Sequence, residues 1–402
     1  MTNNSTFKGY LRQDGRKGIR NVIAVVYLVE CAHHVAREIS SSFGGRQIHL
    51  IGFPGCYPNQ YADRIMNSIC THPNVGAVLL VSLGCESFNR NRLKDNIEKS
   101  GRPVHLVGIQ KTGGTRKTID EGKKWVSETL EKIKAVPLVD MGLHELSIGT
   151  ICGGSDATSG ISANPAVGRA FDTLVAKGAV CIFEETGEMI GLENMMSTRA
   201  RTPALAGELQ KSVEKAAIYY SKMGHGSFAP GNADGGLTTI EEKSMGAYSK
   251  SGNSLITGLI KPGDIPAQGG LYLMDVVPDG EPVFGFPNIN DNAEIVEMIA
   301  SGSHLILFTT GRGSVVGSAI SPVIKICANP ETYDRLSDDM DINAGKILNG
   351  HATLDEVGDE IVNKVIWVAK GGQSCSEELG HQEFILTYKK FEPIGPSCLP
   401  GF

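Results

Sequence analysis

Residues 21–29 read NVIAVVYLV, an almost entirely apolar run that sets the pattern for the first third of the chain. Aliphatic and β-branched residues without polar alternation predict a strand that is buried on both faces. We predict further strands at residues 47–52, 77–83 and 104–108. Amphipathic segments predict helices at residues 31–42, 59–70, 89–99 and 115–134. Because strands and helices alternate, we expect right-handed βαβ crossovers and a parallel, Rossmann-like sheet.

The pattern changes after Pro137, so we predict two α/β domains. The first is Rossmann-like and covers residues 1–145, and the second has glycine-rich loops and covers residues 146–402. Its predicted strands are 147–150, 179–183, 271–276 and 304–310. Its predicted helices are 165–177, 189–196, 203–223, 293–300 and 354–369. The aromatic and proline-rich segment 384–402 is expected to pack on the surface as a strap.

The composition of the 402 residues restricts the class of protein. Hydrophobic residues make up 41% and charged residues 20%, and no apolar run reaches the roughly 18 residues of a membrane span, so we expect a soluble globular protein. A net charge of -6 argues against a nucleic-acid partner. No secretion signal follows Met1, which favours the cytoplasm. Nine scattered cysteines then predict thiols or metal ligands rather than a disulfide framework.

Glycine is over-represented, with 49 in 402 residues against a usual share of ~7%. The glycines gather in short clusters rather than in repeats. Such clusters favour tight turns and a close approach of the backbone to a ligand, which indicates sites built from loops.

Three cysteines follow predicted strands directly. Cys56 comes after the second strand, Cys85 after the third, and Cys152 after the strand that opens the second domain. Ligands in open α/β sheets bind beyond the carboxyl ends of the strands, so the three thiols can converge on one iron site. The alternative is that each cysteine is a small apolar filler in a turn.

The segment 152–168, CGGSDATSGISANPAVG, is dense in small polar residues just before a helix. Its backbone N–H groups and the helix N-terminus are suited to an anion, with Ser155, Asp156 and Asn164 as substrate-binding candidates. The alternative is an elaborate turn in which Asn164 caps the helix. Arg312, in GRGS after a later strand, is a candidate clamp for a substrate carboxylate.

The remaining candidates lie in an acidic strand end and a glycine-rich loop. Glu184 and Glu185 end a strand and form an acidic cluster with Glu188 and Glu193, which can bind a metal or supply a base, or can be a solvated strand end. From the segment 224–243 we place three polar groups near the substrate, namely His225, Asn232 and Lys243.

Several long motifs resemble those of the altronate and galactarate dehydratase family, in the same order and over nearly the whole chain. They are GYLRQDGRKGIRN (9–21), LGCE (83–86), CGGSDATSGISANPAVG (152–168), GNADGGLTTIEEKSMG (231–246), TTGRGS (309–314) and DDMDINAG (338–345). The resemblance implies an iron-dependent lyase, with Fe²⁺ or an iron–sulfur cluster, that eliminates water or sulfite β to the carboxylate of a 2-hydroxy acid.

With a lyase of this kind as the first hypothesis, we assign roles to the candidate residues. Cys56, Cys85 and Cys152 would bind iron, and Glu185, Lys243 and His225 would be catalytic, with Glu185 or Lys243 as the base. The substrate-binding residues would be Ser155, Asp156, Asn164, Asn232 and Arg312.

Two further features bear on the substrate and the partner. The family's dehydratases often carry a small β-rich domain before the GYLRQDGRKGIRN motif, so a separate small subunit is implied, and an oligomer with it. The segment 380–400 resembles the large subunit of (2R)-sulfolactate sulfo-lyase, a member of this family, which favours sulfolactate over altronate or galactarate.

Two hypotheses from other classes remain. GRGSVVG (311–317) can indicate a nicotinamide-dependent oxidoreductase, although its spacing is a weak match to a dinucleotide loop. A non-catalytic module that binds hydroxy acids is the other.

Overall fold

The computed structural model describes residues 6–44, 47–223, 233–279 and 290–389. The first half is built on a four-stranded parallel sheet in the order β4-β3-β5-β6. Its strands are β3 (Val22–Tyr27), β4 (Ile48–Gly52), β5 (Val75–Ser82) and β6 (Val104–Gly108). The predicted strands and their parallel arrangement are confirmed.

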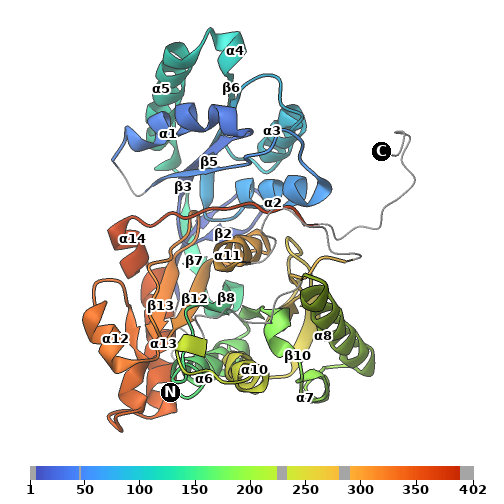
Figure 1. The fold of residues 1–402 in the computed structure, drawn as a ribbon. Coiled ribbons are helices and arrows are strands. Elements are labelled where there is room, and N and C mark those ends of the chain that lie inside the picture. Colours follow the sequence, from blue (N-terminus) through green and yellow to red (C-terminus); the bar gives the residue numbers. More distant parts are fainter. Residues whose placement is uncertain (1–5, 45–46, 224–232, 280–289, 390–402) are drawn as a thin grey trace.

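Helices cover both faces of this sheet (Figure 1). On one face α1 (His33–Ser41) and α5 (Thr115–Ile133) share an apolar core with the strands. On the other face lie α2 (Gln60–Cys70) and α3 (Arg90–Lys99), which contribute to the apolar cluster that continues into the second half. Short helical turns η1 (Glu30–Ala32) and α4 (Ile109–Thr112) complete this half.

The second half is built on a seven-stranded sheet in the order β10-β11-β9-β8-β12-β13-β14, and all its pairs are parallel. The strands are β8 (Ser147–Cys152), β9 (Val180–Phe183), β10 (Ile256–Ile260), β11 (Gly270–Met274), β12 (Leu305–Thr310), β13 (Val323–Cys327) and β14 (Ile342–Asn343). The helices and helical turns are α6 (Ala163–Ala176), η3 (Thr186–Met189), α7 (Glu193–Thr198), α8 (Pro203–Met223), α10 (Ile240–Tyr248), η4 (Ser249–Ser251), α11 (Asp291–Ala300), α12 (Pro330–Arg335), η5 (Ala344–Ile347), α13 (Leu354–Ala369) and α14 (Cys375–Leu379). The α/β fold class is therefore confirmed for both halves.

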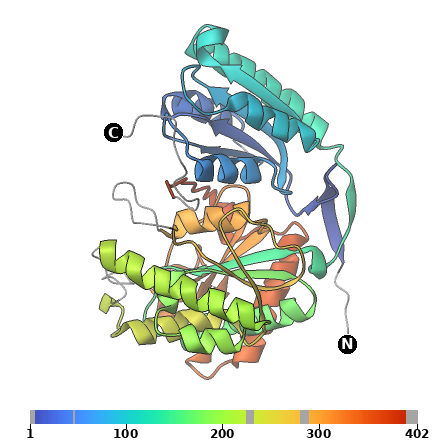
Figure 2. The same ribbon diagram turned by 90° about the vertical axis from the view of Figure 1, so that its right-hand side faces the viewer.

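A small antiparallel sheet that the sequence pattern did not predict lies beside the junction of the two halves (Figure 2). It pairs β1 (Phe7–Leu11) with β2 (Lys17–Gly18) on one edge and with β7 (Leu138–Met141) on the other. A turn η2 (Leu143–Glu145) leads from β7 into β8. The sheet thus holds the two ends of the first half together.

The segment that follows α14 lies between the two halves (Figure 1) rather than on the surface. Leu386, Thr387 and Lys389 are all at most 1% exposed. Leu386 belongs to an apolar cluster that contains residues of both sheets, such as Val26 and Phe308. The predicted surface strap is therefore wrong for the described residues 384–389, because the segment fills the seam between the halves.

All eight cysteines within the described ranges are free thiols, which agrees with the prediction of no disulfide framework. No helix within those ranges is long and apolar enough to span a membrane.

Candidate functional site

The candidate site lies where the connections of the seven-stranded sheet change direction. After β8 the chain forms β9 on one side, whereas β12, formed later, pairs with β8 on the other side. The loops after β8 and β12 therefore leave a crevice at the carboxyl ends of the strands, which is where open α/β sheets bind ligands. The two loops are joined by their backbones, because the Arg312 N–H donates to the carbonyl of Gly154 over 2.9 Å.

Glycines allow these loops to approach closely. Gly154 has φ +58°, a left-handed conformation that favours glycine. A Cβ on Gly311 would lie 2.0 Å from Oδ1 of Asp156, so the buried Asp156 carboxylate fits only against a residue without a side chain. The glycine excess thus has a local reason at this site.

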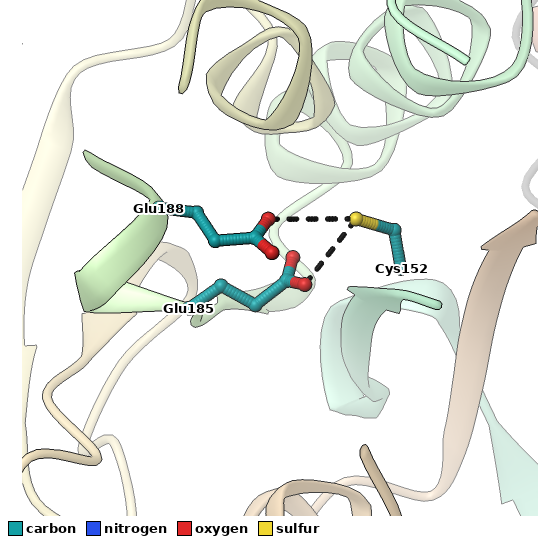
Figure 3. Close-up of side chains that lie close together, drawn as sticks. All are labelled: Cys152, Glu185 and Glu188. Atoms are coloured by element: carbon teal, nitrogen blue, oxygen red, sulfur yellow. Dashed lines mark hydrogen bonds between the residues drawn. The ribbon is translucent and has the colours of Figure 1, made fainter. Parts of the chain in front are cut away.

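The centre of the site is formed by Cys152, Glu185 and Glu188 (Figure 3). The Cys152 thiol lies 3.2 Å from Oε1 of Glu185 and 3.6 Å from Oε2 of Glu188. Cys152 and Glu185 are buried, and Glu188 is half-buried. One ligand atom from each residue lies within 4.8 Å of the other two.

The backbone after β9 places the two glutamates. Glu185 has φ 74°, a left-handed conformation that is uncommon for a residue with a side chain. Such backbone strain tends to occur at functional sites, where the surrounding structure enforces it. The following turn η3 then brings Glu188 to the same side as Glu185.

Two buried lysines face the three acidic groups. Nζ of Lys243, from α10, lies 3.1 Å from the Cys152 thiol, 3.0 Å from Oγ of Ser155 and 2.7 Å from Oε2 of Glu188. Nζ of Lys250, from η4, forms an ion pair with Glu185. Both lysine side chains are at most 3% exposed.

The electrostatic balance at Lys243 favours its charged form. Burial by itself lowers the pKa of a lysine, but the negative charges of Cys152 and Glu188 outweigh burial and raise the pKa of Lys243 above its ordinary value. Lys243 is therefore a cation within the site.

The donor atoms of Cys152, Glu185 and Glu188 fit a single transition-metal ion. Thiolate and carboxylate ligands at about 2.3 and 2.1 Å from one ion are roughly 3.1 to 3.6 Å apart, for angles between 90° and 109°. The two sulfur–oxygen distances fall in this range. One soft sulfur and two hard oxygens suit a first-row transition metal better than Ca²⁺ or Mg²⁺.

The other two predicted iron ligands lie elsewhere. Cys56 and Cys85 are exposed on the loops after β4 and β5, in the four-stranded sheet, and these loops touch where the Ser87 N–H donates to the Cys56 carbonyl over 3.0 Å. Neither belongs to the group formed by Cys152, Glu185 and Glu188. Their role as iron ligands stays a prediction.

The predicted anion loop has two kinds of residue. Ser155 joins the centre through Lys243 and through a 3.4 Å contact with the Cys152 thiol. Asn164 is engaged by the protein itself, since its amide donates to the Gly246 carbonyl over 3.0 Å and accepts from Thr309 over 2.6 Å. It lies inside α6, whose N-cap is Ser162, so the alternative in which Asn164 caps the helix is wrong.

The remaining predicted residues have varied positions. The Asp156 carboxylate accepts the N–H of Thr158 over 2.9 Å and so stabilises its own loop. The side chain of Arg312 lies against Gly235, with its Cδ 3.1 Å from the position of a Cβ there. His225 and Asn232 lie outside the described residues.

Buried acids beneath the site were not fully anticipated. Glu184 is fully buried, and burial, with the nearby charge of Glu294, raises the pKa of Glu184 well above its ordinary value. Burial likewise raises the pKa of Glu294. Lys250 and Asp291 also face the site and carried no signal in the sequence, because neither lies in a motif or at a predicted strand end.

Comparison with known families matches both halves of the chain. Residues 143–391 match the family model described as D-galactarate/altronate dehydratase, C-terminal, and residues 9–134 match D-galactarate dehydratase/altronate hydrolase, second domain. These two ranges agree with a two-domain layout.

Curated relatives cover almost the whole chain. The chain is 31% identical to (2R)-sulfolactate sulfo-lyase subunit beta of Chromohalobacter salexigens, over 95% of this chain and 97% of that protein. It is 30% identical to altronate dehydratase of Bacillus subtilis, over 92% of this chain and 74% of the relative. It is also 31% identical to galactarate dehydratase (L-threo-forming) of Escherichia coli, over 91% of this chain and 73% of the relative.

Proposed function

The chain belongs to the D-galactarate/altronate dehydratase family of lyases, and on that premise we propose that it catalyses metal-assisted β-elimination from a 2-hydroxy acid. The observation that carries the proposal is the group of Cys152, Glu185, Glu188 and Lys243 at the crevice of the seven-stranded sheet. When a proton leaves a carbon atom of an anionic substrate, a metal ion and a nearby positive charge are needed to stabilise the negative charge that forms. A metal-binding group next to a buried lysine can supply both.

We propose that Cys152, Glu185 and Glu188 hold an iron ion. When bound, the iron would polarise the carboxylate and hydroxyl oxygens of the substrate and so make the C2 proton more acidic. The carbon–hydrogen bond of such an acid is too weakly acidic for a side-chain base alone.

The chain's own residues would position and polarise the substrate. We propose that Ser155, the backbone N–H groups of the 152–168 loop and Arg312 bind the anionic groups, with Asp156, Asn164 and Asn232 shaping or completing that site. Glu185, Lys243 and His225 stay the predicted catalytic residues. Because Glu185 is paired with Lys250, and Lys243 with Glu188, we assign Glu185 to holding the metal and Lys243 to stabilising the negative charge that develops on the substrate.

The proposed substrate is (2R)-sulfolactate, which would yield pyruvate and sulfite. The chain is 31% identical to the sulfo-lyase subunit beta over 95% of its own length, and its segment 380–400 resembles that subunit, which supports this choice. Altronate or galactarate dehydration is the second candidate, because those relatives are 30% and 31% identical.

We also propose a separate small subunit as partner. The relative that the chain covers almost completely is named as a subunit beta, and thus acts beside another subunit.

One experiment tests these proposals together. The chain is purified anaerobically with its small subunit, its iron and sulfide are quantified, and sulfolactate, altronate and galactarate are assayed side by side. Sulfite release from sulfolactate is expected, with iron and without sulfide. A 2-keto-3-deoxy acid from a sugar acid would select the second candidate, and no turnover of any of the three acids would contradict the function.

A further inference from the structure

β-Elimination needs a base that accepts the C2 proton. The two residues predicted for this role, Glu185 and Lys243, are already paired with other groups of the protein. Glu185 is held by Lys250 and contacts Cys152, and Lys243 is surrounded by Cys152, Ser155 and Glu188. A base needs a free electron pair within reach of the substrate. The base is therefore expected to be another carboxylate or imidazole of the crevice that is not engaged in this way.

Asp291 lies at the edge of the same crevice, as the first residue of α11. Asn290 caps that helix by accepting the Ala293 N–H over 3.0 Å, so the cap does not involve the Asp291 side chain. Oδ2 of Asp291 lies only 2.1 Å from the position that a Cβ on Gly153 would occupy. Since Gly153 directly follows Cys152, the carboxylate rests on the backbone next to the proposed metal ligand.

The surroundings of Asp291 leave its carboxylate accessible. Asp291 is exposed to solvent at the mouth of the crevice, although the surrounding protein partly desolvates its carboxylate, and among the described residues no side chain donates a hydrogen bond to it. The charged groups that influence it are Glu188 of η3, Lys243 of α10 and Lys250 of η4. Glu294, on the next turn of α11, is buried beneath it.

These surroundings also bring the pKa of Asp291 closer to neutral pH. Desolvation, helped by the charge of Glu188 and opposed by Lys243 and Lys250, raises the pKa of Asp291 to about 6. A carboxylic acid in that range exists in both forms near neutral pH, which suits a group that takes up and returns a proton.

We infer that Asp291 is a proton-transfer residue of this site, an inference that rests on the proposed lyase function. In the sulfolactate reaction the C2–H bond breaks, its proton goes to the Asp291 carboxylate and its electron pair forms the C2=C3 bond. The C3–S bond breaks at the same time, and its electron pair leaves with sulfite. The enol then loses its hydroxyl proton to solvent and takes the proton of Asp291 at C3, which gives pyruvate.

A purely structural role for Asp291 is the competing explanation. An acidic residue in the first turn of a helix interacts favourably with the helix dipole, and α13 has such a residue in Asp355. That role would affect the stability of α11 but not the proton transfer. Asp355 is 70% exposed and paired with Arg169, so Asp355→Asn is a matched control.

The test compares Asp291→Asn, Asp291→Glu and Asp355→Asn with the wild type, each as the complex with the small subunit and iron. We expect Asp291→Asn to lower kcat by about 100-fold or more, the usual contribution of a proton-transfer group, with iron content and KM nearly unchanged. Asp291→Glu should recover part of the rate, and Asp355→Asn should match the wild type. In the wild type kcat/KM should rise with pH through about 6, and this rise should be absent from the residual activity of Asp291→Asn.

Each contrary result has a distinct meaning. An active wild type with an Asp291→Asn variant within a few-fold of it overturns this inference alone. Loss of iron or of the folded state in Asp291→Asn assigns a structural role to the residue and overturns the inference as well. A wild type that turns over none of the three acids overturns the proposed function, and this inference with it.

Discussion

At the scale of single residues, Cys152 is the position where most of the site's interactions meet. Its thiol contacts Ser155 of its own loop, Glu185 and Glu188 of the turn after β9, and Lys243 of α10. The thiol is the one soft donor of the set, so it has the largest influence on which metal can bind.

Replacing cysteines one at a time tests the ligand assignment. We expect Cys152→Ser to lose most of the bound iron and at least 100-fold in turnover, because a serine hydroxyl is a poor ligand at neutral pH. Cys56→Ser and Cys85→Ser should keep their iron if the Cys152, Glu185 and Glu188 set is complete. Metal analysis of the three purified variants measures this. Equal iron loss in all three would support the predicted three-cysteine site instead, and unchanged iron and activity in Cys152→Ser would contradict both assignments.

Part of the site could be predicted from local sequence. Cys152, Glu185 and Lys243 stand in motifs or at strand ends, and the structure brings them together. Lys250 and Asp291 could not be found in this way, because they approach the site only through the fold. The Lys250–Glu185 pair, for example, joins residues 65 positions apart.

At the scale of elements, the regular helices and parallel strands followed from apolar periodicity, but several short strands did not. Strand β13, VIKIC, was missed because Lys325 interrupts the apolar run, although the lysine is buried with the strand. Strands β1 and β7 were missed because they form an antiparallel pair between distant segments and are only partly buried. Local periodicity carries little information on such pairs.

His304, the residue just before β12, connects that strand with β8 and with β2. Its Nδ1 accepts the N–H of Ser147 in β8 over 3.0 Å, and its Nε2 donates to the carbonyl of Lys17 in β2 over 2.8 Å. Because one ring nitrogen accepts and the other donates, the ring is neutral. Burial lowers the pKa of His304 to about 4.

The lowered pKa predicts a loss of stability in acid. In the unfolded state His304 has its usual pKa of 6.5 and binds a proton below that pH. In the folded state it binds the proton only below about pH 4, so the unfolded state is favoured between these two pH values. Between pH 7.5 and pH 5 this single group should cost about 2 kcal/mol of unfolding free energy. His304→Gln should be less stable at pH 7.5 but lose correspondingly less on acidification. Urea unfolding of both proteins at the two pH values measures the difference, and identical pH dependence would refute the prediction.

At the scale of the whole molecule, the two halves share one apolar seam, and a buried ion pair crosses it. Nζ of Lys389 lies 2.8 Å from Oε1 of Glu297, and both side chains are fully buried. Tyr61, from α2 of the first half, donates a hydrogen bond to the same carboxylate. The pair thus connects the segment after α14, the helix α11 and the first half.

Removing one partner of this pair should destabilise the whole chain. Lys389→Met leaves the Glu297 carboxylate buried without a counter-charge, and such losses amount to about 3–5 kcal/mol. Lys134→Met, which breaks the exposed pair with Glu131, is the control and should change little. Equilibrium unfolding in urea measures both variants. A combined Lys389→Met and Glu297→Leu variant should regain part of the loss, and a Lys389→Met protein as stable as the wild type would contradict this role of the pair.

The position of Lys389 in the chain also has a consequence for biosynthesis. Glu297 emerges from the ribosome 92 residues before the lysine that neutralises it. Domains generally fold as units while synthesis proceeds, so the first half can assemble early. The second half, in contrast, has an uncompensated acid in its core until residues 384–389 have been made. Compensation of the buried Glu297 charge is therefore coupled to the synthesis of residues 384–389, and a nascent chain stalled before Lys389 should keep its second half incompletely folded.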